Sequence, residues 1–328
     1  MLSRVANSIY WMSRYIERAE NVSRFVDVNL HLLLDLPEVF SGQWDALVHI
    51  SGDHKDFKTR YGAADDDAVI QFLTFDQLNS NSIFSCVTAA RENASSVREI
   101  ISTETWEAIN EFYLGLRATD AQSRALRDPH EFFRGVRKSS HLISGALAET
   151  MSRGEGWHFS RVGQALERAD KTTRILDIKY FLLLPDVELI GTPIDDLHWN
   201  AVLRSASAFE MYRKIHGKVS ADSIVKFLVL DSEFPRSVRF CLFDADRSMH
   251  AISGTPERSF KNQAERSIGQ LVAELDYTDH ESIIETGLHE MLDGLQAKIN
   301  TVGEAVVATF FSLRPVADGF KPTTRAVQ

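Results

Sequence analysis

Cysteine is scarce in this chain, since Cys86 and Cys241 are the only two among 328 residues. Two thiols cannot build a disulfide framework or a thiolate metal cluster, so a reducing compartment is the expected environment. Both cysteines lie in segments rich in Ile, Phe and Val. That setting favours buried packing over catalysis, because nothing nearby in the sequence would activate a thiol.

Basic side chains and long apolar runs are also in short supply. The 36 Lys and Arg residues against 46 Asp and Glu residues give a net charge of −10, which argues against binding to nucleic acid or to an anionic membrane surface. The longest apolar runs, such as residues 305–311, are far shorter than the roughly 20 residues that span a bilayer. Residues 1–7 lack the apolar core of a secretory signal. We therefore predict a bacterial-type cytoplasmic protein with no nucleic-acid or membrane partner.

Strand signals are nearly absent, because the sequence has no sustained alternation of apolar and polar residues and no Asn-Gly hairpin. Apolar residues instead recur at spacings of three and four, which is typical of amphipathic helices. The fold class is therefore predicted to be all-α. The first helix is expected over residues 3–34, with Pro37 ending it, and further helices near residues 104–118, 130–152, 258–276 and 281–312.

The chain repeats itself over long distances. Residues 17–28 return 150 positions later as residues 167–178, with Glu, Arg, Ala, Arg and Asp identical. Residues 67–90 match residues 222–245 at seven of 24 positions. A unit of this length indicates a duplicated bundle rather than a solenoid, so we predict a pseudo-twofold relation between two copies of about 150 residues. The predicted units are residues 1–153, residues 154–313 and a poorly ordered tail, 314–328.

Each repeated segment carries a polar stripe on one side of its helix. On a helical wheel the stripe consists of Glu17, Glu20, Arg24 and Asp27 in the first copy, and of Glu167, Asp170, Arg174 and Asp177 in the second. The simplest interpretation is a solvated face with ion pairs three and four residues apart, each worth a few tenths of a kcal/mol. A binding role for these residues is the alternative.

Arg18 and Arg168 differ from the stripe because both fall at the edge of the apolar arc of the helix. A guanidinium in that place needs a carboxylate or a carbonyl, since an unpaired buried charge costs several kcal/mol. Either each arginine closes a buried ion pair between helices, or the two line a shared cavity and clamp a carboxylate or phosphate. Arg91 and Glu92 add charges of both signs that could face the same helices.

Signatures of metal and cofactor chemistry are missing. The third residue after Glu17 and after Glu167 is acidic, so the Glu-x-x-His pairs of a di-iron bundle do not occur. The His-Glu pairs that begin at His130, His280 and His289 are not followed by the second His of a zinc-protease helix. Walker loops, dinucleotide fingerprints and nucleophile elbows are missing as well. We predict no metal and no cofactor, and the sequence leaves open whether the protein is an enzyme.

Four stretches of the sequence resemble the bacterial α-E family, all-helical proteins with a Glu-Arg motif. They are residues 9–21, 90–98, 163–170 and 234–238. The resemblance covers most of the chain and maps the motif onto Glu17, Arg18, Glu167 and Arg168. It implies circularly permuted ATP-grasp and transglutaminase-like proteins as partners, in a system of amide ligation or peptide modification.

Three functional hypotheses follow from the motif and the resemblance. The leading one is an accessory component of an ATP-grasp-type peptide ligation system, whose Glu-Arg helices bind a partner or an anionic peptide. In the second, the protein is an enzyme with Glu17 or Glu167 as general base and Arg18 or Arg168 as carboxylate clamp. In the third, the motif is a structural ion-pair staple.

Overall fold

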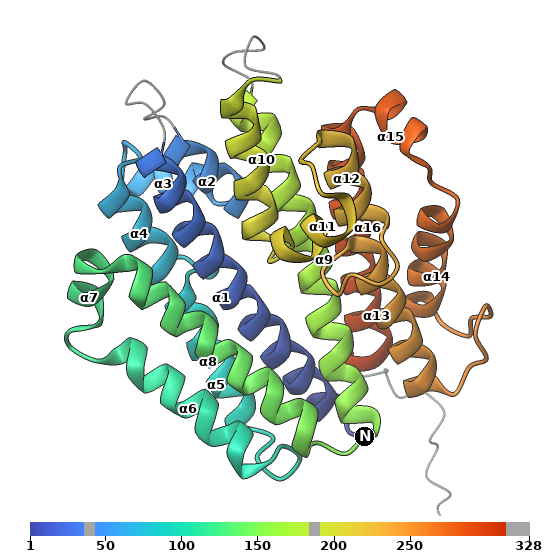
Figure 1. Ribbon diagram of the computed structural model, residues 1–328. Helices are drawn as coiled ribbons and strands as arrows, with labels where there is room; N and C mark the ends of the chain where they lie inside the picture. Colours follow the sequence, from blue (N-terminus) through green and yellow to red (C-terminus); the bar gives the residue numbers. More distant parts are fainter. Residues whose placement is uncertain (36–42, 184–190, 313–328) are drawn as a thin grey trace, which may run out of the picture.

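Two long helices, α1 (Ser3–Asp35) and α9 (Glu155–Leu183), form the centre of the molecule (Figure 1). Two contacts show that they run parallel. The N-terminal ammonium lies 2.5 Å from the Glu155 carboxylate, and twelve residues further along α1 the hydroxyl group of Ser13 lies 2.8 Å from that of Ser160. Further along, α1 and α9 diverge in Figure 1. The repeated Glu-Arg segments therefore lie on neighbouring helices that point the same way.

The computed structural model describes residues 1–35, 43–183 and 191–312, and these residues form helices and connecting turns without a strand. The all-α prediction is confirmed. Besides α1 and α9 the helices are α2 (Gln43–Ser51), α3 (His54–Arg60), α4 (Asp66–Thr74), α5 (Ile83–Ser95), α6 (Thr103–Arg117), α7 (Ala121–Arg127), α8 (Pro129–Thr150), α10 (Pro193–Ser205), α11 (Phe209–His216), α12 (Ala221–Leu230), α13 (Val238–Ser253), α14 (Gln263–Asp276), α15 (His280–Thr286), α16 (Leu288–Val306) and the π-helical turn η3 (Val307–Phe311).

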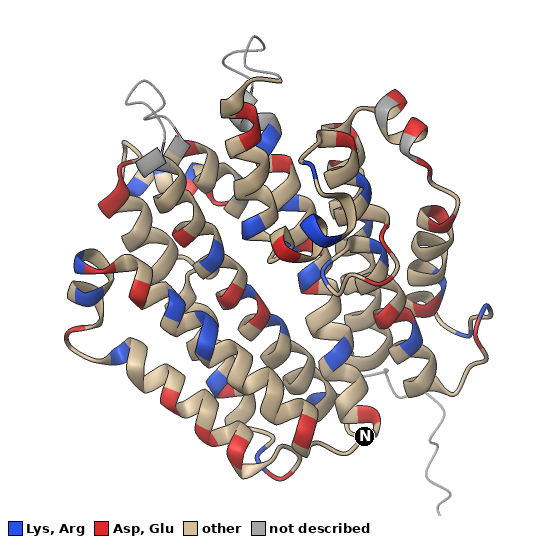
Figure 2. Cartoon of the chain, in the orientation of Figure 1, with Lys and Arg blue, Asp and Glu red and all other residues tan. Residues whose placement is uncertain are grey.

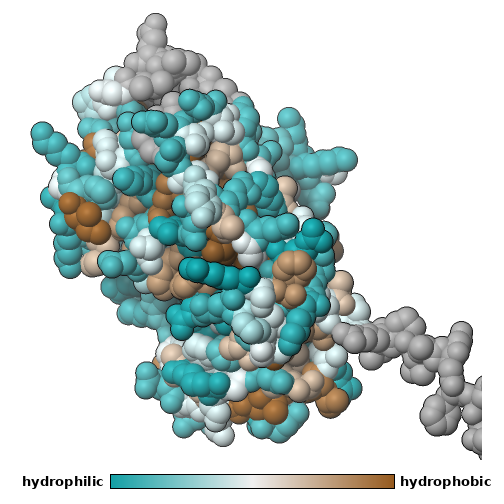
Figure 3. All heavy atoms as spheres, turned by 90° about the vertical axis from the view of Figure 1, so that its right-hand side faces the viewer, coloured by the Kyte–Doolittle hydropathy of each residue, from teal (hydrophilic) through white to brown (hydrophobic). Residues whose placement is uncertain are grey.

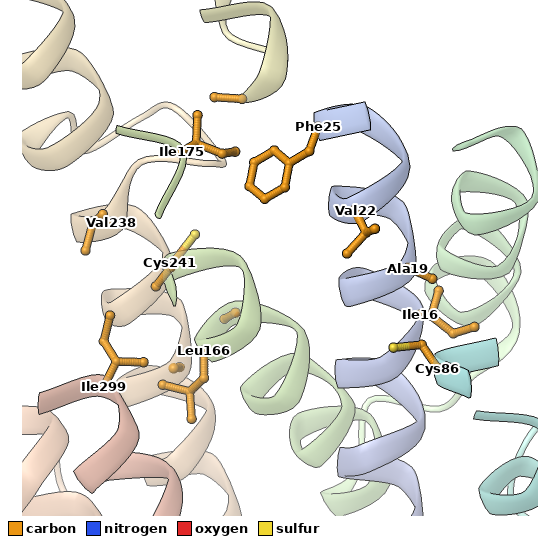
Figure 4. Close-up of a cluster of buried hydrophobic side chains, with 14 of the residues drawn as sticks. Ile16, Ala19, Val22, Phe25, Cys86, Leu166, Ile175, Val238, Cys241 and Ile299 are labelled. Carbon is orange, nitrogen blue, oxygen red and sulfur yellow. The ribbon is translucent and has the colours of Figure 1, made fainter. Parts of the chain in front are cut away.

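Each central helix is covered by its own group of neighbours. Helices α5 and α8 pack on α1, and α13 and α16 pack on α9. Apolar residues line both sides of each central helix (Figure 4). Val22 and Phe25 of α1 and Ile175 of α9 lie on the sides that face each other, whereas Ile16 lies beside Cys86 and Leu166 beside Ile299 on the outer sides. The outer face on the α14 side is largely hydrophilic, with separate apolar spots (Figure 3). The core is thus continuous across the α1–α9 contact.

Most of the expected helix positions are confirmed, with two differences. Helix α14 begins at Gln263 rather than at residue 258, because residues 258–262 are not helical and Arg258 has a positive φ of 60°. The first helix covers Ser3–Asp35, close to the expected 3–34, whereas the segment 281–312 is broken at Gly287, whose positive φ of 89° separates α15 from α16. Pro37 and the tail 314–328 lie outside the described residues. Within the described ranges no helix is both long and apolar enough to cross a membrane.

Candidate functional site

The two Glu-Arg motifs pair with each other where α1 crosses α9. Arg168 of α9 donates from Nε and Nη2 to the Glu17 carboxylate at 2.9 and 2.8 Å. Arg18 of α1 donates in the same way to Glu167, at 2.6 and 3.0 Å. Both pairs have the two-pronged geometry that makes arginine–carboxylate contacts strong and directional. The arginines at the edge of the apolar arc therefore hold the protein's own carboxylates.

Further cations surround both carboxylates. Arg14, one turn before Arg18, donates from Nε to Glu167 at 2.8 Å, and Lys171 lies 3.6 Å from the same carboxylate. Arg236, in the turn before α13, reaches Glu17 at 3.2 Å and Glu20 at 2.7 Å. Sequence reasoning missed Arg236 as a site residue, although it lies in the stretch 234–238 that carries the family resemblance.

The polar stripe is buried, so its interpretation as a solvated face is wrong. Its acidic members expose at most 7% of their surface, because neighbouring helices cover them. Glu17 and Glu167 each face the other central helix, whereas Asp27 lies against α8 and Asp177 against α16. They are Glu17, Glu20, Asp27, Glu167, Asp170 and Asp177. Figure 2 shows acidic and basic bands following one another along α1. The stripe remains tolerable in the interior because each buried charge meets opposite charges at hydrogen-bonding distance.

The cations hold the central carboxylates in their charged form. Burial alone would raise the pKa of the Glu167 carboxyl, but the surrounding arginines and lysine bring it well below its ordinary value. The same competition lowers the pKa of Glu17, Glu20 and Asp170. A general base at neutral pH needs a pKa raised toward neutrality. The network therefore gives Glu17 and Glu167 the opposite of what the enzyme hypothesis requires.

Acid is expected to destabilise the protein through this network. Because the native pKa values of these carboxyls are lower than those of the unfolded chain, the unfolded state takes up more protons, and stability falls as the pH drops below the ordinary glutamate value of 4.5. The raised pKa values of Asp177 and Asp246 act in the opposite direction but concern fewer groups. Denaturant titrations at a series of pH values should give a steady plateau near neutrality and a steep loss below about pH 4.5.

The Glu167→Gln variant is the control for that pH dependence. It lacks one of the titrating carboxyls, so the loss of its stability with acid should be shallower than that of the natural chain. Equal slopes for both proteins would contradict the assignment of acid sensitivity to this network.

The outer ends of the two stripes also form ion pairs. Asp27 contacts His130 at 2.8 Å and Arg137 at 2.6 Å, both from α8. In the second copy of the stripe Asp177 contacts His289 of α16 at 2.7 Å. Arg24 pairs with Glu20, and Arg174 lies 2.9 Å from Asp170. Hence every residue of the two stripes is engaged with another charged side chain.

A groove of about 720 Å³ opens beside this network, between α1, α8, α10 and α11. Arginines from three helices line it: Arg24 of α1, Arg137 of α8 and Arg204 of α10. The Nε atom of Arg24 is buried without a hydrogen-bond partner among the described residues. Arg204 is exposed, with its guanidinium 4.4 Å from the centre of the Phe209 ring. The lining also contains the carboxylates of Asp27 and Glu210, and Arg137 pairs with Asp27. Arg204 is therefore the exposed donor that this wall offers to an anion.

Comparison with known families places the chain in one of them. A family described as a predicted alpha-helical domain with a conserved ER motif, alpha-E, matches residues 1–311. The chain belongs to this family. The description names an ER motif, and Glu-Arg pairs occur in this alpha-E chain at Glu17-Arg18 and Glu167-Arg168.

Two mycobacterial proteins resemble this alpha-E chain. They are the uncharacterized proteins Rv2567 of Mycobacterium tuberculosis and Mb2597 of Mycobacterium bovis, each 23% identical over 343 residues. The matches cover 94% of this chain and 37% of each relative, so the chain spans little more than a third of the length of these curated relatives. No solved structure matches the chain.

Two further predicted features of the alpha-E chain lie away from the ion pairs. Arg91 of α5 faces α6, where its Nε donates to Asn110 at 2.8 Å and its guanidinium lies 4.7 Å from the centre of the Tyr113 ring. Glu92 is exposed. The structure therefore does not bring Arg91 and Glu92 into the Glu-Arg network.

Cys86 and Cys241 are fully buried on opposite sides of the α1–α9 contact (Figure 4). Burial raises the pKa of both thiols to about 12. A thiol with such a pKa stays protonated and is a weak nucleophile near neutral pH. This agrees with packing as their role.

Proposed function

We propose that this alpha-E protein is a non-catalytic helical component that holds an anionic segment of a peptide or partner protein in the groove between α1, α8, α10 and α11. The observation that carries the proposal is the arginine wall formed by Arg24, Arg137 and Arg204. Groove-shaped sites lined by arginine from separate elements are suited to carboxylates and phosphates, because a guanidinium binds both in a two-pronged manner.

The electrostatics of Arg24 support an anionic ligand. Burial lowers the pKa of the Arg24 guanidinium, and the neighbouring Arg236 and Arg137 lower it further, more than Glu20 compensates. A carboxylate that enters the groove would place a second negative charge beside Arg24, which already pairs with Glu20.

In this proposal the Glu-Arg pairs act as a staple. They fix α1 relative to α9, and α1 carries Arg24 into the groove. The support is their burial and their mutual geometry, in which the bidentate faces of Arg18 and Arg168 are already occupied. The motif thus contributes to binding by positioning the wall rather than by touching the ligand.

The partner class follows from the resemblance to the α-E family. An ATP-grasp-type enzyme that forms amide bonds acts on carboxylates, and a carboxylate-rich peptide has the charge that the groove would accept. We therefore propose cytoplasmic ATP-grasp-type and transglutaminase-like proteins as partners. Co-purification of the chain with an ATP-grasp-type protein from the same genome tests this proposed partnership. If each protein, used as bait, fails to recover the other, the result would count against it.

We also infer that residues 1–153 and 154–313 are two copies of one ancestral unit with a pseudo-twofold relation. The reciprocal pairs support this, since Glu17 receives Arg168 and Glu167 receives Arg18. A second pair of equivalent contacts points the same way: Arg14 reaches Glu167, and Gln164, 150 positions after Arg14, reaches Glu17 at 3.2 Å.

Removing Arg204 is expected to weaken binding of an anionic peptide. With a fluorescently labelled hexaglutamate peptide as probe, Arg204→Ala should raise Kd by about tenfold, which corresponds to the loss of one charge-assisted contact. Fluorescence anisotropy at low and at moderate salt measures the change. Because Arg204 is exposed, the substitution should leave the fold intact.

The matched control is Arg117→Ala, which removes the same charge from an exposed arginine at the end of α6, away from the groove. Its Kd should equal that of the natural chain. If Arg117→Ala weakens binding as much as Arg204→Ala, or if the natural chain does not bind the peptide, the groove is not an anion site.

A further inference from the structure

Three potential metal ligands converge at the mouth of the groove. The Nε2 atom of His31 lies 2.8 Å from the Nδ1 atom of His130, and that Nδ1 atom lies 2.8 Å from Oδ1 of Asp27. His31 Nε2 and Asp27 Oδ1 are 3.9 Å apart. Three atoms bound tetrahedrally to one zinc ion lie about 3.4 Å from one another, which is within the range of these separations.

Hydrogen bonding alone accounts poorly for this arrangement. A ring nitrogen carries either one proton or one lone pair. If His130 Nδ1 is protonated, its single proton must be shared between Asp27 and an unprotonated His31 Nε2, and if it is unprotonated it presents a lone pair to the Asp27 carboxylate. A cation at the centre of the three atoms would satisfy all of them at once.

The helices bring the three ligands together in a form that suits a metal. Asp27 and His31 are one turn apart on α1, and His130 is the second residue of α8, directly after Pro129. The second oxygen of Asp27 accepts from Arg137 at 2.6 Å, which is the kind of outer contact that orients a coordinating carboxylate. Asp27 is buried, whereas the side chains of both histidines are 53% exposed, so the cluster is accessible from the groove.

We propose that Asp27, His31 and His130 form a binding site for a divalent transition metal, with Zn²⁺ the favoured ion, and that its fourth coordination position faces the groove. Imidazole and carboxylate ligands suit zinc, and three protein ligands leave a position for water or an incoming anion. A carboxylate or phosphate in the groove would then meet the metal and the arginine wall together. The expectation of no metal depended on the lack of Glu-x-x-His and zinc-protease patterns, and Asp27, His31 and His130 belong to neither pattern.

A second group, Asp45, His49 and His54, provides an internal comparison. The Nε2 atom of His49 lies 3.3 Å from one carboxylate oxygen of Asp45, and the Nε2 atom of His54 lies 3.2 Å from the other. The two imidazole rings are stacked, with their centres 3.6 Å apart and an interplanar angle of 18°. The Asp45 side chain is 55% exposed. This group has the same ligand types but lies outside the groove, so it serves as a control of equal composition.

The metal site deepens the proposed function, but its test needs no peptide. Isothermal titration calorimetry of the full chain, freed of metal by a chelator, with ZnCl₂ near neutral pH should show one tight site. The double variant His31→Ala/His130→Ala should weaken that binding by at least about 100-fold. Substitution by Co²⁺ should give the visible absorption of a tetrahedral site in the natural chain and not in this variant.

The double variant His49→Ala/His54→Ala is the control and should bind Zn²⁺ like the natural chain. Loss of binding in this control, equal losses in both variants, or no binding by the natural chain would overturn the proposal. Circular dichroism should show the same helix content for all three proteins, because the replaced histidines are at least partly exposed. Peptide binding measured in the presence of a chelator separates the two proposals, since the arginine wall remains in place without metal.

Discussion

Replacing Glu167 by Gln is expected to lower the free energy of unfolding by about 3 to 5 kcal/mol. The amide keeps the size of the side chain but removes the negative charge from among Arg14, Arg18 and Lys171. The side chains of these three cations are between 10 and 16% exposed, so water cannot replace the lost carboxylate. The cost arises from the cations left unpaired rather than from the net value of the ion pair.

Chemical denaturation of the variant and of the natural chain measures this loss. Glu149→Gln is the matched control, because Glu149 is an exposed residue of α8 and its substitution should change stability by no more than about 0.5 kcal/mol. Similar stabilities of Glu167→Gln and Glu149→Gln would show that the network is solvated and does not hold α1 to α9.

Part of the site can be predicted from the sequence. The wheel places Arg18 and Arg168 at the edge of the apolar arc, and a guanidinium there must find an anion. The repeated sequence makes the partner predictable in outline, because the Glu of each of two similar helices can meet the Arg of the other when the helices pack side by side and parallel. The three- and four-residue spacing of apolar residues also predicts the bounds of α1, which differ little from the observed Ser3–Asp35.

The rest of the site depends on contacts that a single helix does not encode. A wheel compares residues of one helix, so it could not show that Glu20 and Asp170 are buried by other parts of the chain. Arg236 reaches Glu20 across 216 positions of sequence, and His130 reaches His31 across 99. Such contacts follow from the packing of α8 and α13 on the central pair, for which the sequence carries no local signal.

Close packing of the central pair leads to the second large effect. Gly163→Ala is expected to lower the free energy of unfolding by about 3 kcal/mol, because the added methyl group would lie 2.4 Å from the carbonyl oxygen of Tyr10 and 3.3 Å from Cγ of Arg14. The carbonyl belongs to the backbone of α1 and cannot move alone. The helices would have to separate, which would lengthen the paired contacts of Glu17 with Arg168.

The control for this substitution is Gly145→Ala in α8, where a methyl group meets nothing within 4 Å. There the higher helix propensity of Ala should stabilise the protein by up to about 1 kcal/mol, so the two Gly→Ala changes should have opposite signs in denaturant titrations. In the Gly163→Ala background, Glu167→Gln should cost less than in the natural chain, because the ion pairs are already loosened. Additive losses would mean that Gly163 sets the helix spacing without affecting the Glu-Arg pairs.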